Sequence, residues 1–205
     1  ALFGFVAIAL PLAAIQQAAE RVGREARALI NIRPFTGSRL LAHDPWAMDA
    51  LFAEQILSLV DEGPESVVEL GSGHSTVLIA RRLESRGRGR VVAVDHLAEY
   101  ADRTRAWLER EGLGHRATVV HAPVVEREVE GRRLSWYSGD ALAAALPDRI
   151  DLLLVDGPPD LFGPGVRWPA VPLLRDRLGP GAAVLMDDGD RPAERRAAFD
   201  WRRRL

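Results

Sequence analysis

The sequence predicts an α/β fold of the Rossmann-like, doubly wound kind, a mainly parallel sheet with helices on both faces, preceded by N-terminal helices. Three observations predict this fold. Short runs of Val, Leu and Ile recur along the chain, and segments with helical periodicity separate them. The runs are apolar throughout, which is typical of strands buried on both faces of a parallel sheet. Three of the runs end in Asp, at the edge where such sheets bind ligands.

The N-terminal part differs in composition from the rest of the chain. Residues 1–15 are almost wholly apolar, but the run is shorter than the ~20 residues that span a bilayer. Ala, Val and Leu recur three and four apart over residues 16–32, which predicts a helix. We expect residues 1–33 to form an apolar and amphipathic helical segment, and residues 34–205 to form the main domain.

Two interpretations remain open for residues 1–15. In one, they contact a membrane, and the arginines that follow keep the rest of the chain in the cytoplasm. In the other, they form an apolar helix packed on the domain or on a partner. In either case we expect a cytoplasmic protein, with or without membrane attachment through residues 1–15.

Elements of the main domain follow one another in a regular order. A loop is predicted over residues 34–45, and Asp44 would cap a helix that starts at Pro45 and ends near Val60. The alternation over residues 129–137 indicates an extra hairpin. The other predicted strands cover residues 67–70, 90–95, 117–122, 150–156 and 182–187, and the other helices cover 74–85, 98–111, 141–146 and 169–178.

Composition excludes several classes of function. Lys and Arg number 27 against 29 Asp and Glu, so no basic field points to nucleic acid as a partner. There is no cysteine, which excludes disulfides, thiolate metal sites and a Cys nucleophile. At 205 residues, with 47% hydrophobic and 27% charged residues, the chain has the size and mix of one globular domain.

A glycine-rich turn follows the first predicted strand, in Glu69-Leu-Gly-Ser-Gly-His-Ser-Thr76. Gly71 and Gly73 let the backbone approach a ligand, and the next helix presents free N–H groups there. Thr76 stands where the dinucleotide fingerprint has its third glycine, so binding of a pyrophosphate is disfavoured. The turn therefore predicts a small-ligand site of another kind.

Asp95 ends the second predicted strand. In a doubly wound sheet this position lies beside the first glycine-rich turn, where a carboxylate can accept hydrogen bonds from both hydroxyls of a ribose. The alternative is that Asp95 caps the helix that follows it. The glycines upstream favour the ribose.

These motifs together resemble the class I S-adenosylmethionine-dependent methyltransferases, over about residues 46–191. The residues that carry the likeness are Glu69-x-Gly-x-Gly, Asp95 and the run from Asp151 to Asp156. The stretches Val68-Glu-Leu-Gly-Ser-Gly-His-Ser-Thr76, Leu154-Val-Asp-Gly-Pro-Pro159 and Leu185-Met-Asp-Asp-Gly-Asp-Arg191 are similar to a group of bacterial methyltransferase-domain proteins, many with N-terminal membrane or coiled-coil segments.

The resemblance implies methyl transfer from S-adenosylmethionine to a small-molecule acceptor, with an oxygen nucleophile expected. It also implies the roles of the residues at the first two strand ends. Glu69, Gly71, Ser72 and Gly73 would line the amino-acid end of the cofactor, and Asp95 would hold its ribose. The oligomeric state is not indicated.

The same resemblance implies roles for residues farther along the chain. His96 would lie beside the adenine, and His121 and Ala122 would flank the adenine edge. Asp156 would face the methyl donor and the acceptor. Trp46 would either close over the cofactor or serve as a core anchor.

Asp156, Asp187 and Asp188 end two strands that should be neighbours. Three carboxylates so near one another suit a hard divalent cation. The arrangement resembles the magnesium site of catechol-type and certain sugar O-methyltransferases, in which the ion would bind and orient the acceptor hydroxyl. The alternative is that Asp156 serves the cofactor site, and that the later acids cap a turn or meet Arg191. Asp156, Asp187 and His121 are the residues expected to act as base.

Two other functions share parts of this pattern. An NAD-dependent oxidoreductase would have the same strand, glycine, helix and Asp order, but the third glycine and a Tyr-x-x-x-Lys set are missing. A non-catalytic, membrane-associated domain could keep the fold. The methyltransferase superfamily usually has two more strands after the fifth, so we expect a domain that is either short or cut off at its C-terminal end.

Overall fold

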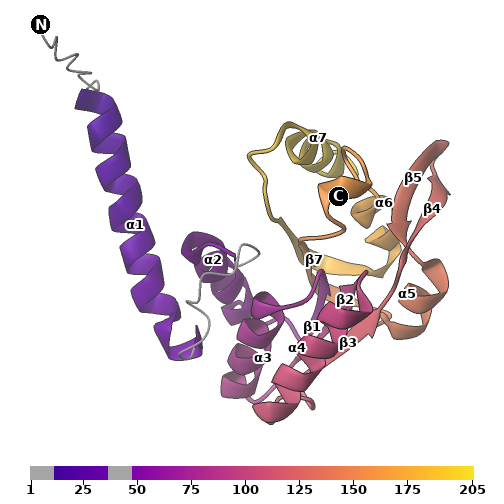
Figure 1. Cartoon of the computed structure of the whole chain (residues 1–205), viewed down its shortest axis with the longest axis horizontal. Helices are drawn as coiled ribbons and strands as arrows, with labels where there is room; N and C mark the ends of the chain where they lie inside the picture. Colours follow the sequence, from indigo (N-terminus) through magenta and orange to yellow (C-terminus); the bar gives the residue numbers. More distant parts are fainter. Residues whose placement is uncertain (1–11, 37–47) are drawn as a thin grey trace, which may run out of the picture.

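The computed structural model describes residues 12–36 and 48–205. Figure 1 shows a sheet with helices on both sides, and a long helix α1 (Leu12–Thr36) that stands away from it. Only the C-terminal end of α1 approaches the domain, where Ile32 packs with Ala53 and Leu57 of α2 (Ala50–Asp61). The N-terminal helical segment is thus a projection from the sheet domain.

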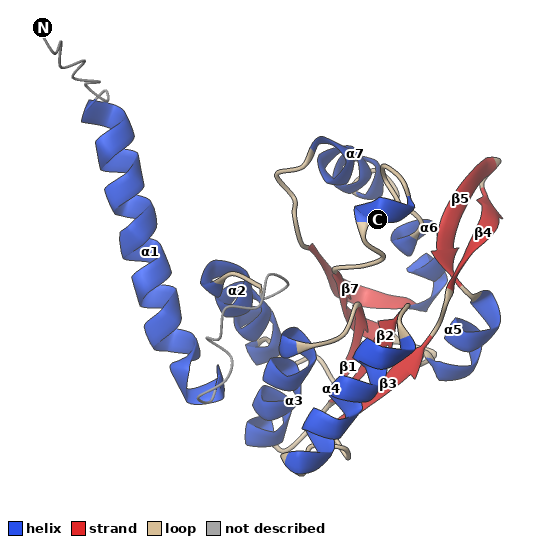
Figure 2. Cartoon of the chain, in the orientation of Figure 1, coloured by secondary structure: helices blue, strands red, loops and turns tan. Residues whose placement is uncertain are grey.

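The sheet has five parallel strands in the order β3-β2-β1-β6-β7. Figure 2 draws the strands in red and the helices around them in blue. The chain moves outward from β1 to β3, then returns to the other side of β1. This reversal is the topological switch point of a doubly wound sheet, and it confirms the predicted fold class. The strands are β1 (Ser66–Leu70), β2 (Arg90–Asp95), β3 (Ala117–His121), β6 (Ile150–Val155) and β7 (Leu178–Met186).

Helices cover both faces of the sheet because successive side chains of each strand point to opposite faces. In β1, Val67 packs on one side and Val68 and Leu70 on the other. Each large apolar side chain buried in this way contributes about 1.5–3 kcal/mol. One face carries α2, α3 (His74–Arg86) and α4 (Ala98–Arg110), and the other carries α5 (Gly139–Ala145), α6 (Ala170–Leu174) and α7 (Pro192–Trp201).

The predicted hairpin is present but starts earlier than expected. Its strands are β4 (Val124–Val129) and β5 (Arg132–Tyr137), paired antiparallel. Glu130 and Gly131 turn the chain with φ of 49° and 74°. A two-residue turn of this kind needs positive φ at both positions, and Glu-Gly is a weaker signal for it than Asn-Gly. Residues 129–137, over which the alternation predicts the hairpin, hold only the end of β4, the turn and β5.

The segment before β7 also departs from the prediction. The helix expected over residues 169–178 is α6 followed by the short 3-10 helix η2 (Arg175–Arg177), and β7 begins at Leu178 instead of residue 182. Gly179, Pro180 and Gly181 resemble a loop in sequence. Here they form part of an edge strand across a register shift opposite Ile150, and sheet edges and bulges tolerate proline.

Boundaries near the N-terminus differ from the prediction as well. Helix α1 continues through Pro34 to Thr36, where a loop was expected. The cap of α2 is Asp49, whose side chain accepts from Phe52 N at 2.7 Å. Asp44 and Pro45 lie outside the described residues, and so does most of the apolar run 1–15. Within residues 12–36 and 48–205, no helix is both long and apolar enough to cross a bilayer. The division at residue 33 stays a prediction.

Candidate active site

Backbone hydrogen bonds align the ends of four neighbouring strands, β2, β1, β6 and β7. Gly71 N donates to Val94 O at 2.7 Å, and Asp156 N donates to Leu70 O at 2.8 Å. Asp187 N then donates to Val155 O at 3.0 Å. The glycine turn and two of the predicted acids therefore lie along one edge of the sheet, at its switch point between β1 and β6.

The glycine turn has a backbone that other residues rarely adopt. Gly71 has φ of +115° and Gly73 of +153°, values that disfavour any side chain. A Cβ at Gly71 would lie 3.5 Å from the backbone of Asp156, so the turn packs directly beside the end of β6. A Cβ at Gly73 would meet nothing within 4 Å. The turn therefore borders open space at Gly73.

Glu69 is fully buried beneath this turn. Its Oε2 accepts from Thr76 Oγ1 at 2.5 Å, and Thr76 Oγ1 in turn accepts from Gly73 N at 3.0 Å. Glu69 Oε1 is buried without a hydrogen-bond partner in the described part of the chain. Burial raises the pKa of Glu69 from 4.5 to about 7, although the neighbouring hydroxyls of Ser75 and Thr76 oppose the rise. Such a carboxyl group is suited to receive a cationic donor.

Asp95 lies two residues before Leu97, the N-cap of α4. Its Oδ1 accepts from Leu97 N at 2.9 Å, but α4 has no side-chain cap, so the capping alternative is not what the structure shows. Its Oδ2 accepts from Ser72 Oγ at 2.7 Å, which ties it to the glycine turn. A carboxylate can accept about four hydrogen bonds, so two positions remain for a ligand. These two local contacts leave Asp95 able to bind a ribose.

His96, His121 and Ala122 lie together beyond Asp95. His121 Nε2 lies 3.2 Å from the backbone oxygen of His96, and Ala122 N donates to Asp95 O at 2.8 Å. The ring of Phe162 packs edge-on against His96, with 5.4 Å between centroids. Phe162 belongs to the 3-10 helix η1 (Asp160–Phe162) after β6, and the sequence motifs do not indicate it.

The structure does not bring His121 close to Asp156 or Asp187, the other two residues expected to act as base. Strands β2 and β1 separate β3 from β6, and three strand spacings of ~4.8 Å make about 14 Å. Trp46, the other residue expected to cover the cofactor, lies outside the described residues.

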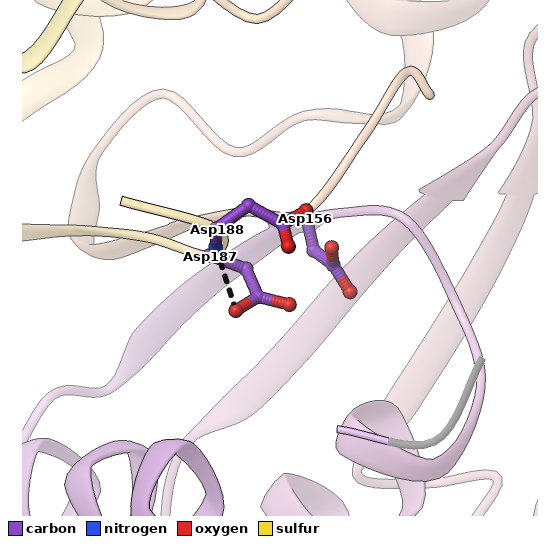
Figure 3. A group of neighbouring side chains, drawn as sticks. All are labelled: Asp156, Asp187 and Asp188. Atoms are coloured by element: carbon purple, nitrogen blue, oxygen red, sulfur yellow. Dashed lines mark hydrogen bonds between the residues drawn. The ribbon is translucent and has the colours of Figure 1, made fainter. Parts of the chain in front are cut away.

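Asp156, Asp187 and Asp188, which we call the acid cluster, converge as their strand positions predict (Figure 3). One carboxylate oxygen of each lies within 4.8 Å of the others. Asp188 has a left-handed φ of 56°, and its N–H donates to Asp187 Oδ1 at 2.8 Å, the dashed line in Figure 3. Burial and then the Asp187 charge hold the pKa of Asp156 well above its ordinary range, and burial likewise raises the pKa of Asp187. The metal role itself stays a prediction.

Arg167, which the sequence motifs do not indicate, joins the acid cluster. It is 4% exposed, and its Nη2 lies 3.2 Å from Asp156 Oδ1 and 3.1 Å from Asp188 Oδ2. Arg191 Nη2 lies 3.0 Å from Asp188 Oδ1, so the expected contact between Arg191 and a late acid is present. The one cue to Arg167 in the sequence is a lone charge within Gly165-Val-Arg-Trp-Pro-Ala170.

Tyr137 forms part of the floor of the site. Its hydroxyl is fully buried and has no partner among the described residues. A Cβ on Gly157, the residue after Asp156, would lie 2.3 Å from that hydroxyl. Tyr137 and Gly157 therefore pack so closely that the glycine is required there.

Comparisons with solved structures agree with this architecture. A methyltransferase of Podospora anserina, PaMTH1, solved with SAH bound, superposes with a TM-score of 0.58 at 16% identity, covering 89% of this chain and 73% of that one. The O-methyltransferase from Bacillus cereus in complex with SAH gives 0.52 at 19% identity, covering 94% and 84%. The O-methyltransferase TomG from Streptomyces achromogenes, solved with SAM, gives 0.51 at 22%, covering 89% and 77%. At these identities the likeness shows the fold.

Family membership rests on the sequence itself. No curated protein matches the chain in sequence. A family model described as a methyltransferase domain matches residues 68–189, from the first strand to the acid cluster, well over half of the chain. The chain therefore belongs to the methyltransferase-domain family, in agreement with the resemblance seen in its motifs.

Proposed function

We propose that this methyltransferase takes its methyl group from S-adenosylmethionine and transfers it to an oxygen atom of a small-molecule acceptor. The observation that carries the proposal is the glycine turn itself: Gly73 borders open space, Ser72 is bonded to Asp95, and Gly71 packs against Asp156. When bound, the cofactor supplies a methyl group already activated on a positively charged sulfur. The SAM- and SAH-bound proteins of the same fold support this choice of cofactor.

The residues at the first two strand ends fit the amino-acid and ribose parts of this cofactor. Gly71, Ser72 and Gly73 would lie against the amino-acid end, and the unpartnered, buried oxygen of Glu69 suits its ammonium group. Asp95 would accept from the ribose hydroxyls through its remaining lone pairs.

Three neighbouring residues would flank the adenine, with the Phe162 ring beside them: His96, His121 and Ala122. Trp46 is proposed to cover the cofactor on the strength of the resemblance alone, and the core-anchor alternative stays open.

Acceptor and base would lie on the other side of the glycine turn. An acceptor hydroxyl must lose its proton during transfer. Asp156, which packs beside Gly71, and Asp187 both have pKa values raised by burial, which makes their carboxylates stronger bases. His121, about three strands away, is proposed only for the adenine edge. Alignment of the acceptor with the sulfur–methyl bond would supply much of the acceleration.

Titration calorimetry with S-adenosylhomocysteine, and separately with NAD, tests this proposal. We expect S-adenosylhomocysteine to bind and NAD to give no heat, because Thr76 replaces the third glycine of the dinucleotide fingerprint. Asp95→Ala should weaken S-adenosylhomocysteine by about 2–3 kcal/mol, or roughly 30- to 150-fold.

The matched control is Asp102→Ala on the same side of the sheet. Asp102 is a mainly exposed residue of α4 that pairs only locally with Arg105. The Asp102→Ala variant should bind S-adenosylhomocysteine like the unchanged protein. Equal affinity of the Asp95 and Asp102 variants would remove Asp95 from the site, and NAD binding in place of S-adenosylhomocysteine would overturn the proposed cofactor.

A further inference from the structure

We propose that Arg167 is the resident cation of the acid cluster, so that the site holds its acceptor-facing carboxylates without a divalent metal ion. The inference rests on the proposed function and deepens it, because it assigns a positioning residue to the acceptor side. It also disagrees with the magnesium site that the three acids suggested from sequence.

The guanidinium of Arg167 bridges the backbones of two strand ends. Nη1 donates to the backbone oxygen of Asp187 at 3.0 Å, and Nη2 donates to the backbone oxygen of Asp156 at 3.2 Å. These two carbonyls follow β7 and β6. Arg167 therefore sets the relative position of the two segments that carry the acid cluster.

The same guanidinium also contacts two of the three carboxylates. Nη2 lies 3.2 Å from Asp156 Oδ1 and 3.1 Å from Asp188 Oδ2, while Arg191 takes Asp188 Oδ1 at 3.0 Å. Asp187 Oδ1 accepts from the N–H of Asp188. Both oxygens of Asp188 and one each of Asp156 and Asp187 are therefore already engaged.

A divalent cation does not fit this arrangement well. A hard ion of this kind takes six or more oxygen ligands. Here both carboxylate oxygens of Asp188 are already paired with a guanidinium. An ion between the three acids would also lie close to the Arg167 charge, which guanidinium retains at every pH at which proteins fold. In this interior the mutual repulsion of two cations is screened little.

Arg167 is not free to move aside for a metal ion. Its side chain is 5% exposed, and leaving would abandon two backbone carbonyls and two carboxylates at once. The next residue, Trp168, is anchored as well, because its Nε1 donates to Asp200 at 2.7 Å and its carbonyl accepts from Trp201 Nε1 at 2.9 Å. Hydrogen bonds from helix α7 thus hold the turn that contains Arg167 in place.

Arg167 therefore acts as a positioning residue for Asp156. It holds Oδ1 of Asp156, and in this proposal it thereby orients the carboxylate toward the acceptor. Removing a partner from such a buried ionic group leaves uncompensated carboxylates, which would then attract another cation. The loss of Arg167 should therefore create the metal affinity that the unchanged protein lacks.

Binding of Mn²⁺, followed by the loss of the free-ion signal in electron paramagnetic resonance, tests this inference with the full chain. We expect little binding to the unchanged protein, and binding at least about tenfold tighter to Arg167→Gln. Adding Asp156→Asn to Arg167→Gln should abolish the gain. Arg191→Gln is the matched control: it also removes a guanidinium from Asp188, but it leaves Arg167 in place, so it should bind Mn²⁺ like the unchanged protein.

Stoichiometric Mn²⁺ binding by the unchanged protein, as tight as that of Arg167→Gln, would overturn the inference. If Arg167→Gln does not fold, Arg167→Lys keeps the charge, and the measurement on the unchanged protein still decides the question. Calorimetry with S-adenosylhomocysteine on the same samples separates the two proposals. Failure to bind S-adenosylhomocysteine speaks against the proposed function, whereas Mn²⁺ binding by the unchanged protein speaks against the role of Arg167 alone.

Discussion

The pH dependence of stability can be tested at Glu69, because its carboxyl group is buried and only one of its two oxygens is hydrogen-bonded. One oxygen accepts from Thr76 and the other has no partner among the described residues. Burial raises its pKa from 4.5 to about 7. Between these two pH values the folded protein keeps a proton that the unfolded chain releases, so stability falls as pH rises through this window and is level above it.

The magnitude follows from the same pKa values. A rise from 4.5 to about 7 corresponds to about 3 kcal/mol of stability present below pH 4.5 and lost by pH 8. Glu69→Gln keeps the shape of the side chain and cannot ionise. We expect the variant to match the unchanged protein near pH 4.5 and to exceed it by up to about 3 kcal/mol at pH 8.

Urea unfolding followed by circular dichroism, at intervals from pH 4.5 to 8, measures this difference. Other buried acids contribute to the pH slope of both proteins, so the difference between the two curves isolates Glu69. Glu65→Gln is the control, since Glu65 precedes the same strand with its side chain 69% exposed, and it should leave the curve unchanged. Parallel curves for Glu69→Gln and the unchanged protein would refute the reasoning.

The same substitution should have the opposite effect on cofactor binding. If the ionised carboxylate receives the cofactor's ammonium group, Glu69→Gln should bind S-adenosylhomocysteine more weakly at pH 8 while being more stable. In the unchanged protein the affinity should rise between pH 6 and pH 8, because binding must release the proton of Glu69. A pH-independent affinity in calorimetry would place the ammonium group elsewhere.

The remaining predictions concern the floor of the site and the two ends of the chain. Tyr137→Phe should be neutral or about 1 kcal/mol stabilising in urea unfolding, because the buried hydroxyl has no partner within residues 12–36 and 48–205; a clear loss would show that it has one. Gly157→Ala should cost about 1–3 kcal/mol, because its Cβ would lie 2.3 Å from that hydroxyl, and adding Tyr137→Phe should recover part of the loss. Trp201→Ala should cost about 3–5 kcal/mol, since Trp201 is 4% exposed and bonded to Trp168, and an unchanged melting temperature would contradict this packing. Deleting residues 1–15 should leave thermal unfolding of the domain cooperative, because the first half of α1 that is described is largely exposed; loss of cooperativity would show that these residues belong to the core.

Several parts of this protein could be predicted from sequence because they depend on local patterns. Apolar runs alternating with helices lead to a parallel doubly wound sheet, since crossover connections are right-handed almost without exception. The carboxyl ends of such strands share one edge, so the sequence alone places Gly71, Asp95, Asp156 and Asp187 together. The convergence of the acid cluster follows from the same rule.

Other parts were decided only by the tertiary structure. Arg167, Tyr137 and Phe162 reach the site from a turn, a hairpin strand and a 3-10 helix, and none of these positions belongs to a motif. Their side chains are placed by packing between segments that are distant in sequence, which periodicity does not encode. For His121 the position at a strand end was predicted correctly. Two intervening strands nevertheless separate it from Asp156 and Asp187. Backbone hydrogen bonds between neighbouring strands set which residues share the edge, whereas side-chain contacts across the core set which of them can act together.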